Sequence, residues 1–150
     1  MSLPTSIQLH IVTPDRSLVR EQVDEVEIPG SEGYFGVLPG HTPMLASLSV
    51  GELWYRKGQE KTHLAIAFGF AEVLPDRVTV LALVAEHAEE IDAERAELAR
   101  QRAETRLQQL RDVDYDRARA ALEKAVARLQ VSSRLALGGR VGRSRMRPPE

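Results

Sequence analysis

At 150 residues, the chain is long enough for one ordinary domain, or for a small domain with an appendage. That length excludes a large multidomain enzyme. The 43% hydrophobic and 28% charged residues suffice for a buried core, which excludes a wholly disordered chain. The absence of cysteine excludes disulfides, thiolate zinc sites, iron–sulfur clusters and cysteine nucleophiles, and it fits a reducing compartment such as the cytosol.

The net charge of −2 conceals two halves of opposite sign. Residues 1–90 contain 6 basic and 13 acidic residues, whereas residues 91–150 contain 14 basic and 9 acidic residues. Five of these arginines lie in residues 131–150, where they could bind the phosphates of a nucleic acid. The acidic first half and the scarcity of aromatic residues that could stack on bases argue against this. We therefore interpret the segment as a solvated tail and expect no nucleic-acid partner.

Apolar runs in the sequence are short. The longest, residues 78–85, has the length of a strand and is far below the roughly 20 residues that span a bilayer. The amino terminus has no basic cluster followed by an apolar segment, as a secretory signal would. We expect neither a membrane span nor a cleaved signal.

From Ile7 to about Glu86, short runs alternate apolar and polar residues, which is typical of β-strands. Residues 7–11 and 26–28 follow this alternation, and residues 78–84 form a more apolar run typical of a deeply buried strand. The runs are separated by the turn-forming segments Thr13-Pro14-Asp15, Pro29-Gly30-Ser31, Pro39-Gly40, Arg56-Lys57-Gly58 and Pro75-Asp76-Arg77. This spacing predicts an antiparallel β-sandwich or barrel over residues 1–88.

After Ile91 the apolar residues recur with the 3.6-residue period of a helix. The expected apolar stripe of the first helix is Ala96, Ala99, Ala103, Leu107 and Leu110. A second helix is expected to begin after Asp114, a favourable N-cap, with the stripe Tyr115, Ala118, Leu122, Ala125 and Leu129. The short connection at residues 111–113 predicts an antiparallel helical hairpin over residues 89–137, followed by a flexible Arg-rich tail over residues 138–150.

Alanine dominates the two stripes of the predicted hairpin. Because small side chains bury little apolar area, at ~25 cal/mol per Å², we expect the hairpin to be marginally stable alone. Two helices of about 20 residues, each roughly 30 Å long at 1.5 Å per residue, would reach about 60 Å if the hinge opened. The sequence therefore predicts a movable arm.

Motifs for catalysis or metal binding are weak. Residues 30–36 contain three glycines without the spacing of a phosphate-binding loop, and we interpret them as turn residues. The histidines at positions 10, 41, 63 and 87 are scattered, and none has a second histidine two or four residues away. Adjacent Glu89 and Glu90 are typical of a solvated helix start rather than of an acid and base pair. We expect no catalytic residue, no metal site and no enzyme activity of the chain itself.

Residues 33–51 carry the most specific signal: Gly-Tyr-Phe-Gly-Val-Leu-Pro-Gly-His-Thr-Pro-Met-Leu-Ala-Ser-Leu-Ser-Val-Gly. This stretch closely resembles the signature of the epsilon subunit of F-type ATP synthases. The resemblance extends to residues 8–14, 67–73, 78–82, 91–96 and 113–115, so that only the tail after about Leu137 lies outside it. It implies an N-terminal antiparallel β-sandwich followed by a C-terminal α-helical hairpin.

The resemblance further implies a non-catalytic rotor subunit in the central stalk, coupling the catalytic head to the proton-carrying c-ring. The sandwich would bind the gamma subunit and the c-ring through Ser31, Glu32, Gly33, Tyr34 and His41. The hairpin would contact the alpha and beta subunits when extended, and could inhibit ATP hydrolysis there. The implied location is peripheral, at the cytoplasmic face of the bacterial plasma membrane. An internal turn with His41 bonded locally is the alternative for the loop.

A regulatory ATP site is implied as well, because some family members hold ATP between the folded helices. The matching positions here are Glu86, Asp92, Arg95, Ala96, Lys124 and Arg128. Lys124 departs from the family's arginine and lacks its planar fork. Asp92 could otherwise cap the first helix, with Arg95 solvated. Apart from this ATP, no cofactor is expected.

The alternative to the family assignment is an unrelated β-sandwich adaptor with a helical protein-interaction arm. It explains the periodicities but leaves the match at residues 33–51 as coincidence. An enzyme of unknown type is the third and least favoured hypothesis.

Overall fold

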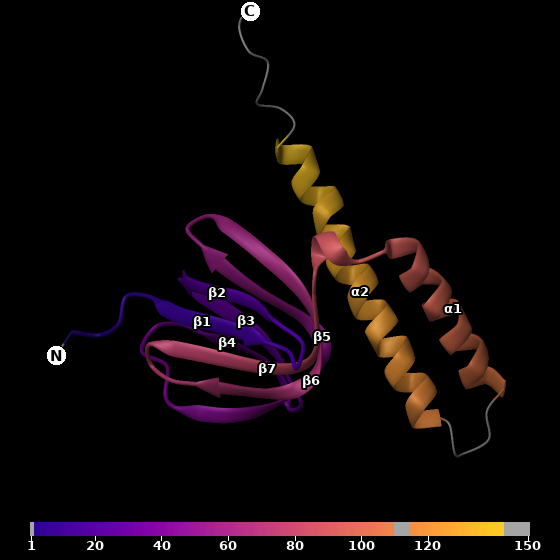
Figure 1. The fold of residues 1–150 in the computed structure, drawn as a ribbon, viewed down its shortest axis with the longest axis horizontal. Helices are drawn as coiled ribbons and strands as arrows, with labels where there is room; N and C mark the ends of the chain where they lie inside the picture. Colours follow the sequence, from indigo (N-terminus) through magenta and orange to yellow (C-terminus); the bar gives the residue numbers. More distant parts are fainter. Residues whose placement is uncertain (1, 110–114, 143–150) are drawn as a thin grey trace, which may run out of the picture.

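The computed structural model describes residues 2–109 and 115–142, with side chains described up to residue 135. A β domain is followed by two helices, which confirms the predicted fold class (Figure 1). The elements are β1 (Ile7–Val12), β2 (Ser17–Val23), β3 (Glu25–Gly30), β4 (Gly33–Val37), β5 (Met44–Lys57), β6 (Glu60–Val73), β7 (Arg77–His87), the short 3₁₀ helix η1 (Ala88–Glu90), α1 (Ala93–Gln109) and α2 (Tyr115–Gly142).

The seven strands form one sheet in the order β2-β1-β7-β6-β5-β3-β4, which folds over on itself around a single core. Neighbouring strands are antiparallel, except that β1 runs parallel to β7, with Leu9 opposite Val78. This one parallel pair joins the first strand to the last. Local alternation of residues cannot reveal such a pairing, because it depends on contacts about 70 positions apart.

Alternation does identify the buried face of the strands. Ile7, Leu9 and Ile11 are fully buried, whereas the residues between them are partly exposed. Within residues 26–28, which the sequence places in a strand, Val26 and Ile28 are buried in the same core. Because successive side chains of a strand point to opposite faces of the sheet, every second residue faces the core of the sandwich.

A bend in β6 changes which residues face inward. Leu64 and Ile66 are buried before the bend, and Ala71 and Val73 after it. Between them Phe68 has a φ of 60° and Gly69 a φ of 122°. A Cβ on Gly69 would collide with the carbonyl oxygen of Leu81 on β7, so the close approach of the two strands requires glycine.

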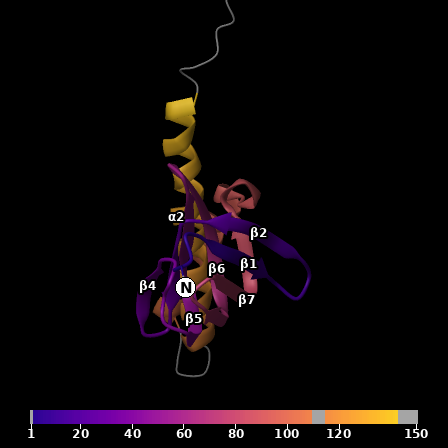
Figure 2. The ribbon, with the colours of Figure 1, turned by 90° about the vertical axis from the view of Figure 1, so that its left-hand side faces the viewer.

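The helices lie against one end of the β domain, with α2 between α1 and the sheet, and α2 contacts β5 and β6 (Figures 1 and 2). The amino terminus lies on the side away from the helices (Figure 1). The contact between α1 and α2 consists of small residues, as the predicted stripes indicate. The buried residues of these stripes include Ala96, Ala103, Ala118 and Ala125. Among the described residues, neither helix has an apolar stretch long enough to cross a membrane.

A second apolar cluster fastens the hairpin to the sandwich. Val131 of α2 is fully buried beside Ala65 of β6 and Ala88 of η1, with Ile91 packed against them. This cluster lies close to the hinge between β7 and α1. Docking of α2 therefore combines a small apolar contact with polar contacts described below.

Two boundaries differ from the sequence-based prediction. Pro29 and Gly30 belong to β3, and the turn falls on Ser31 and Glu32; the ladder to β5 is irregular here, which accommodates a proline without an N–H. The second helix continues to Gly142, so residues 138–142, predicted in the tail, are helical. A glycine inside a helix costs only about 1 kcal/mol and keeps its N–H, so a helix can continue through it. The predicted connection at 111–113, the Asp114 cap and residues 143–150 lie outside the described residues.

Candidate functional site

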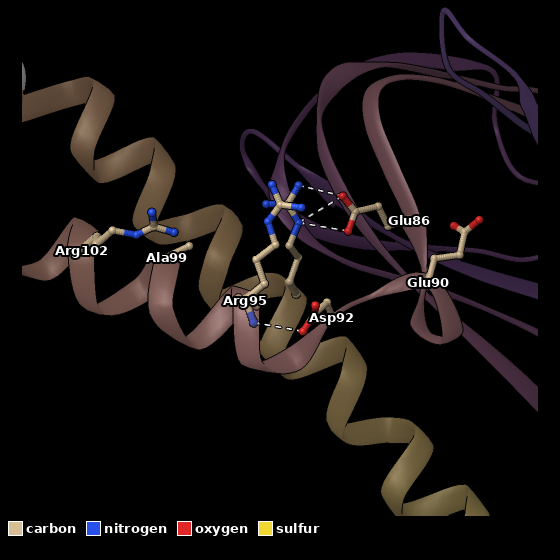
Figure 3. Close-up of a pocket in the computed structure, with 8 residues that line it drawn as sticks. Glu86, Glu90, Asp92, Arg95, Ala99 and Arg102 are labelled. Carbon is tan, nitrogen blue, oxygen red and sulfur yellow. Dashed lines mark hydrogen bonds and ion pairs between the residues drawn. The ribbon is translucent and has the colours of Figure 1, made fainter.

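A cavity of about 500 Å³ lies where β7, η1 and the two helices meet (Figure 3). Its volume is within the range of small-molecule sites. The lining residues are Glu86, Glu90, Asp92, Arg95, Ala96, Ala99, Arg102 and Arg128. The structure therefore brings together five of the six residues that the sequence suggested for ATP. Lys124 is the exception.

Asp92 caps the first helix, as the alternative interpretation held. Its Oδ1 accepts a hydrogen bond from the backbone N–H of Arg95 at 3.1 Å, and its carbonyl accepts one from Ala96 at 3.0 Å (Figure 3). These bonds satisfy two N–H groups in the first turn of α1. Asp92 thus fixes the direction in which α1 leaves the hinge, and with it the position of Arg95 in the cavity.

Arg128 joins α2 to the last strand. Its Nη2 lies 2.7 Å from Oε1 of Glu86, and its Nε lies 3.0 Å from Oε2. Figure 3 also shows the Arg95 side chain extending from α1 toward Glu86. A forked arginine–carboxylate pair is a strong, directional contact. The Glu86 carboxylate is therefore already engaged by a cation of the second helix.

Glu90 is paired with an arginine near the amino terminus of the chain. Arg16, in the connection between β1 and β2, places Nη1 and Nη2 at 2.6 and 2.7 Å from the two carboxylate oxygens. The backbone N–H of His87 also donates to Glu90, at 3.0 Å. The hydrogen bonds from Arg16 lower the pKa of Glu90 to about 2. This pair anchors the hinge to the sandwich.

The remaining charges make the cavity suitable for an anion. Glu86 and Glu90 each have an arginine partner, and the remaining acid, Asp92, accepts only a backbone N–H. Arg95 and Arg102 have no acidic partner among the described side chains, so the remaining charges are two cations and one anion. Arg102 donates to the carbonyl of Leu98 instead. Guanidinium groups form paired hydrogen bonds with phosphate oxygens. The cavity can therefore receive a phosphate-bearing ligand between the helices.

Lys124 does not line this cavity. Its Nζ lies 5.5 Å from the centre of the Phe68 ring, at the bend of β6. This distance is within the range of a cation–π contact. Lys124 is four residues before Arg128, one turn away, and both line a hollow against the sheet, but only Arg128 also lines the cavity between the helices. Lys124 therefore contributes to docking of α2, and it lies outside the cavity that holds the other residues matched by the resemblance.

Three lining residues, Glu90, Ala99 and Arg102, were not among the predicted site residues. Arg102 follows Arg95 by seven residues and lies on the same helical face as Ala99, so the period of α1 could have identified it. Glu90 was interpreted as a solvated charge. Its partner Arg16 is 74 positions away, and no local pattern signals that contact.

The predicted contact turn is exposed at the edge of the sandwich. Ser31 and Glu32 connect β3 to β4, and the Ser31 hydroxyl accepts a hydrogen bond from the Ser47 hydroxyl at 2.9 Å. Tyr34 is 56% exposed, and its hydroxyl accepts the backbone N–H of Glu52 at 3.2 Å. Ser31, Glu32, Gly33 and Tyr34 therefore form one exposed unit braced against β5.

His41 lies apart from this unit, beyond the opposite end of β4. Its Nδ1 donates to the carbonyl of Thr42 at 2.7 Å, and the neighbouring Gly40 N–H donates to the Pro75 carbonyl at 2.7 Å. The ring is therefore bonded locally, as the alternative for this loop held. The structure does not bring His41 together with the contact turn.

An exposed apolar face adjoins the contact turn. The backbone N–H of Ser31 donates to the carbonyl of Ser47 on β5. Ser47 lies opposite Phe70 on β6, which lies opposite Leu81 on β7, so this face begins beside the contact turn. Phe70, Leu81 and Leu83 are 56%, 54% and 63% exposed, and with the loop after β1 they line a cavity of about 490 Å³. Sequence reasoning missed this face, because alternation alone does not tell which outward residues are left uncovered.

Among the described residues, no group of three or more His, Cys, Asp or Glu side chains is placed to hold a metal ion.

Comparisons with known proteins agree on one family. The model of the ATP synthase delta/epsilon chain beta-sandwich domain matches residues 6–88, and that of its long alpha-helix domain matches residues 89–133. The ATP synthase epsilon chain of Syntrophobacter fumaroxidans is 55% identical over 129 residues, covering 85% of this chain and 96% of that one. The epsilon chain of Nitratidesulfovibrio vulgaris is 51% identical over 127 residues, covering 84% and 95%.

Solved structures extend the likeness to three dimensions. A chain in the Euglena gracilis mitochondrial ATP synthase (OSCP/F1/c-ring) superposes with a TM-score of 0.77 at 28% identity, covering 91% of this chain and 84% of that one. A chain in the Tetrahymena thermophila mitochondrial ATP synthase, described as central stalk and c-ring, gives a TM-score of 0.56 at 12% identity and shows a shared fold.

Proposed function

The chain belongs to the family of ATP synthase delta and epsilon chains, and we propose that it is a non-catalytic rotor subunit of the central stalk. In this role the sandwich, residues 1–88, binds the gamma subunit and the c-ring, and so couples the catalytic head to proton movement. The unrelated adaptor is not favoured, because the family match covers both the sandwich and the helices. The proposed location is the cytoplasmic face of the bacterial plasma membrane.

The observation that carries this proposal is the exposed apolar face of Phe70, Leu81 and Leu83 beside the contact turn. Contiguous apolar side chains that lie open to water usually mark a protein-binding surface. Three such residues on two hydrogen-bonded strands give an apolar, hollowed surface for a partner. We assign this face to the gamma subunit, and the exposed polar turn at Ser31–Tyr34 to the c-ring.

Binding to the purified gamma subunit of the same organism tests the assignment. Leu81→Glu introduces a charge at the centre of the face while leaving the core untouched, and we expect binding to weaken about 30-fold, the effect of losing ~2 kcal/mol at an interface. Leu98→Glu, at a 57% exposed position on α1, is the matched control and should bind normally. Equal affinities for the two variants would refute the assignment of this face.

We further propose that the hairpin regulates ATP hydrolysis. Its buried seam is made of small alanines, and its contact with the sandwich is limited, so a modest difference in affinity can shift it between docked and extended states. The extended arm would meet the alpha and beta subunits.

A regulatory ATP between the helices is the second part of this proposal. The two arginines without acidic partners, Arg95 and Arg102, support it, since they offer donors for the phosphates. ATP bound there would stabilise the docked hairpin by mass action. Because Arg128 is paired with Glu86, it would bind the phosphates only by sharing its hydrogen bonds with Glu86 or by breaking that pair.

A further inference from the structure

Glu52 is a buried acid at the contact between α2 and the sheet. The residue is 7% exposed and lies on β5, on the face that α2 covers. Arg134 of α2 reaches it with Nε 3.2 Å from Oε2 and Nη2 3.2 Å from Oε1. His63 of β6 places Nδ1 3.3 Å from the same Oε1. The carboxylate is therefore shared between a residue of the arm and a residue of the sheet.

The geometry of His63 is unusual. Its Nδ1 is buried and has no hydrogen-bond partner among the described residues, although it lies so close to a carboxylate oxygen. A buried polar atom without a partner is costly, and it marks a place where a change of protonation alters the balance of contacts. The ring side chain is 18% exposed, so a proton from solvent can reach it.

The partners differ in mobility. Glu52 pairs with Ala65 on β6, and Trp54 pairs with His63, so Glu52 and His63 are diagonal neighbours in the sheet and stay together whatever α2 does. Arg134 belongs to α2 and leaves with it. Detachment of the helix therefore leaves the carboxylate with His63 as its one partner in this cluster.

Two further charged residues lie near Glu52, His63 and Arg134. Lys61 of β6 and Glu89 of η1 line the same cavity as His63 and Arg134. Lys61 lies over the Trp54 ring at 4.1 Å from its centre. Because Lys61 and Glu89 have opposite charges, the net charge of this cluster depends on Glu52, His63 and Arg134.

We propose that Glu52, His63 and Arg134 form a pH-sensitive latch that holds α2 on the sandwich at neutral pH and releases it as His63 takes up a proton. With His63 neutral, Arg134 is the cation that compensates the buried carboxylate, and docking is favoured. A protonated His63 compensates Glu52 from within the sheet and repels Arg134. The docked state then holds two cations around one anion, so acidification weakens docking. This inference rests on the proposed movement of the hairpin, but not on the proposed ATP site or on the rotor role.

Release of the arm can be measured on the full chain by fluorescence transfer. Because the sequence has no cysteine, dyes can be attached specifically at Gln59→Cys on the β5–β6 turn and Gln130→Cys on α2, both exposed positions. Urea titration at pH 8 and pH 5.5 then gives the docking equilibrium in each condition. These limits bracket the range in which an imidazole titrates. We expect docking to be about fivefold weaker at pH 5.5, as repulsion between two nearby partly screened charges requires.

Variants separate the latch from general acid effects. His63→Gln keeps a polar side chain that cannot take a proton, and should dock equally at both pH values. Arg134→Gln removes the repelled cation from a 41% exposed side chain, and should dock weakly with little dependence on pH. His10→Gln, on β1, is the matched control and should keep the full response. An unchanged pH response in His63→Gln, or equal docking of the unmodified chain at the two pH values, would overturn the latch, as would loss of the response in His10→Gln.

Discussion

The guanidinium of Arg128 on α2 forms an ion pair with the carboxylate of Glu86 near the end of β7, with Nη2 2.7 Å from Oε1. Both residues line the cavity that Arg95 also lines. It therefore links docking of the hairpin to the site proposed for ATP.

Replacing Glu86 with glutamine should loosen the docked hairpin. Both side chains are partly exposed, 32% for Arg128 and 27% for Glu86, so we expect a loss of about 1–2 kcal/mol, between the values for surface and buried pairs. Urea release of α2, followed by fluorescence transfer, measures this loss. Arg119→Ala breaks the more exposed pair with Glu123 on the same helix, and should cost less than about 0.5 kcal/mol. Equal effects of the two substitutions would contradict the role of Glu86.

Gly69→Ala should destabilise the sandwich strongly. The φ of 122° disfavours any side chain, and a Cβ would strike the Leu81 carbonyl on β7. We expect a decrease of at least about 2 kcal/mol in the free energy of unfolding, measured by denaturant titration. Gly36→Ala is the control, since a Cβ on Gly36 has open space around it and β4 is exposed there. A stable Gly69→Ala protein would show that the bend is not fixed by this contact.

The Arg16–Glu90 pair should make hinge stability fall in acid. Hydrogen bonds from Arg16 lower the pKa of Glu90 to about 2 from its ordinary value of 4.5. A depressed carboxyl pKa stabilises the fold above pH 4.5, and this contribution is lost as the pH falls from 4.5 toward 2. Because Glu90 is 36% exposed, we expect about 1 kcal/mol or less.

Arg16→Gln should remove this part of the pH dependence, as measured by thermal unfolding between pH 2 and pH 6. Arg20→Gln, at an exposed position with no ion pair among the described residues, should preserve it. Parallel curves for Arg16→Gln and the unmodified chain would contradict the role of the pair.

ATP binding should depend on the arginines of the cavity and not on Lys124. Calorimetry with the full chain should show at least tenfold weaker binding for Arg95→Gln and for Arg102→Gln, since each loses charged hydrogen bonds to phosphate. Lys124→Gln should bind ATP with nearly unchanged affinity, because Lys124 faces Phe68. No heat with the unmodified chain at millimolar ATP would remove the site, and would leave Asp92 as a helix cap.

Local patterns in the sequence predict much of this structure. The period of two located strand faces such as Ile7 to Ile11, and the period of 3.6 located the alanine seam. The hinge residues Asp92 and Arg95 were found by resemblance, and the fold does place them in one cavity. Lys124 lies outside that cavity for a different reason: it is one turn from Arg128 on nearly the same side of α2, but its ammonium lies over the Phe68 ring at the bend of β6.

Contacts between distant segments were beyond such patterns. The pairs Arg16–Glu90 and Arg134–Glu52 join residues 74 and 82 positions apart, and each depends on how β1 and α2 pack after folding. The end of α2 at Gly142 was missed because glycine and arginine signal a tail by composition, whereas helix hydrogen bonds tolerate both.

The division of labour between sandwich and hairpin is tested most directly by ending the chain after Glu90, which keeps the Arg16–Glu90 pair and removes both helices. The measurement is ATP hydrolysis by the detached catalytic head assembled with the shortened chain, compared with the full chain. We predict that the shortened chain assembles with gamma and that hydrolysis rises. Normal assembly with an unchanged rate at every ATP concentration would contradict regulation by the hairpin, and a folded fragment that fails to bind gamma would contradict coupling by the sandwich.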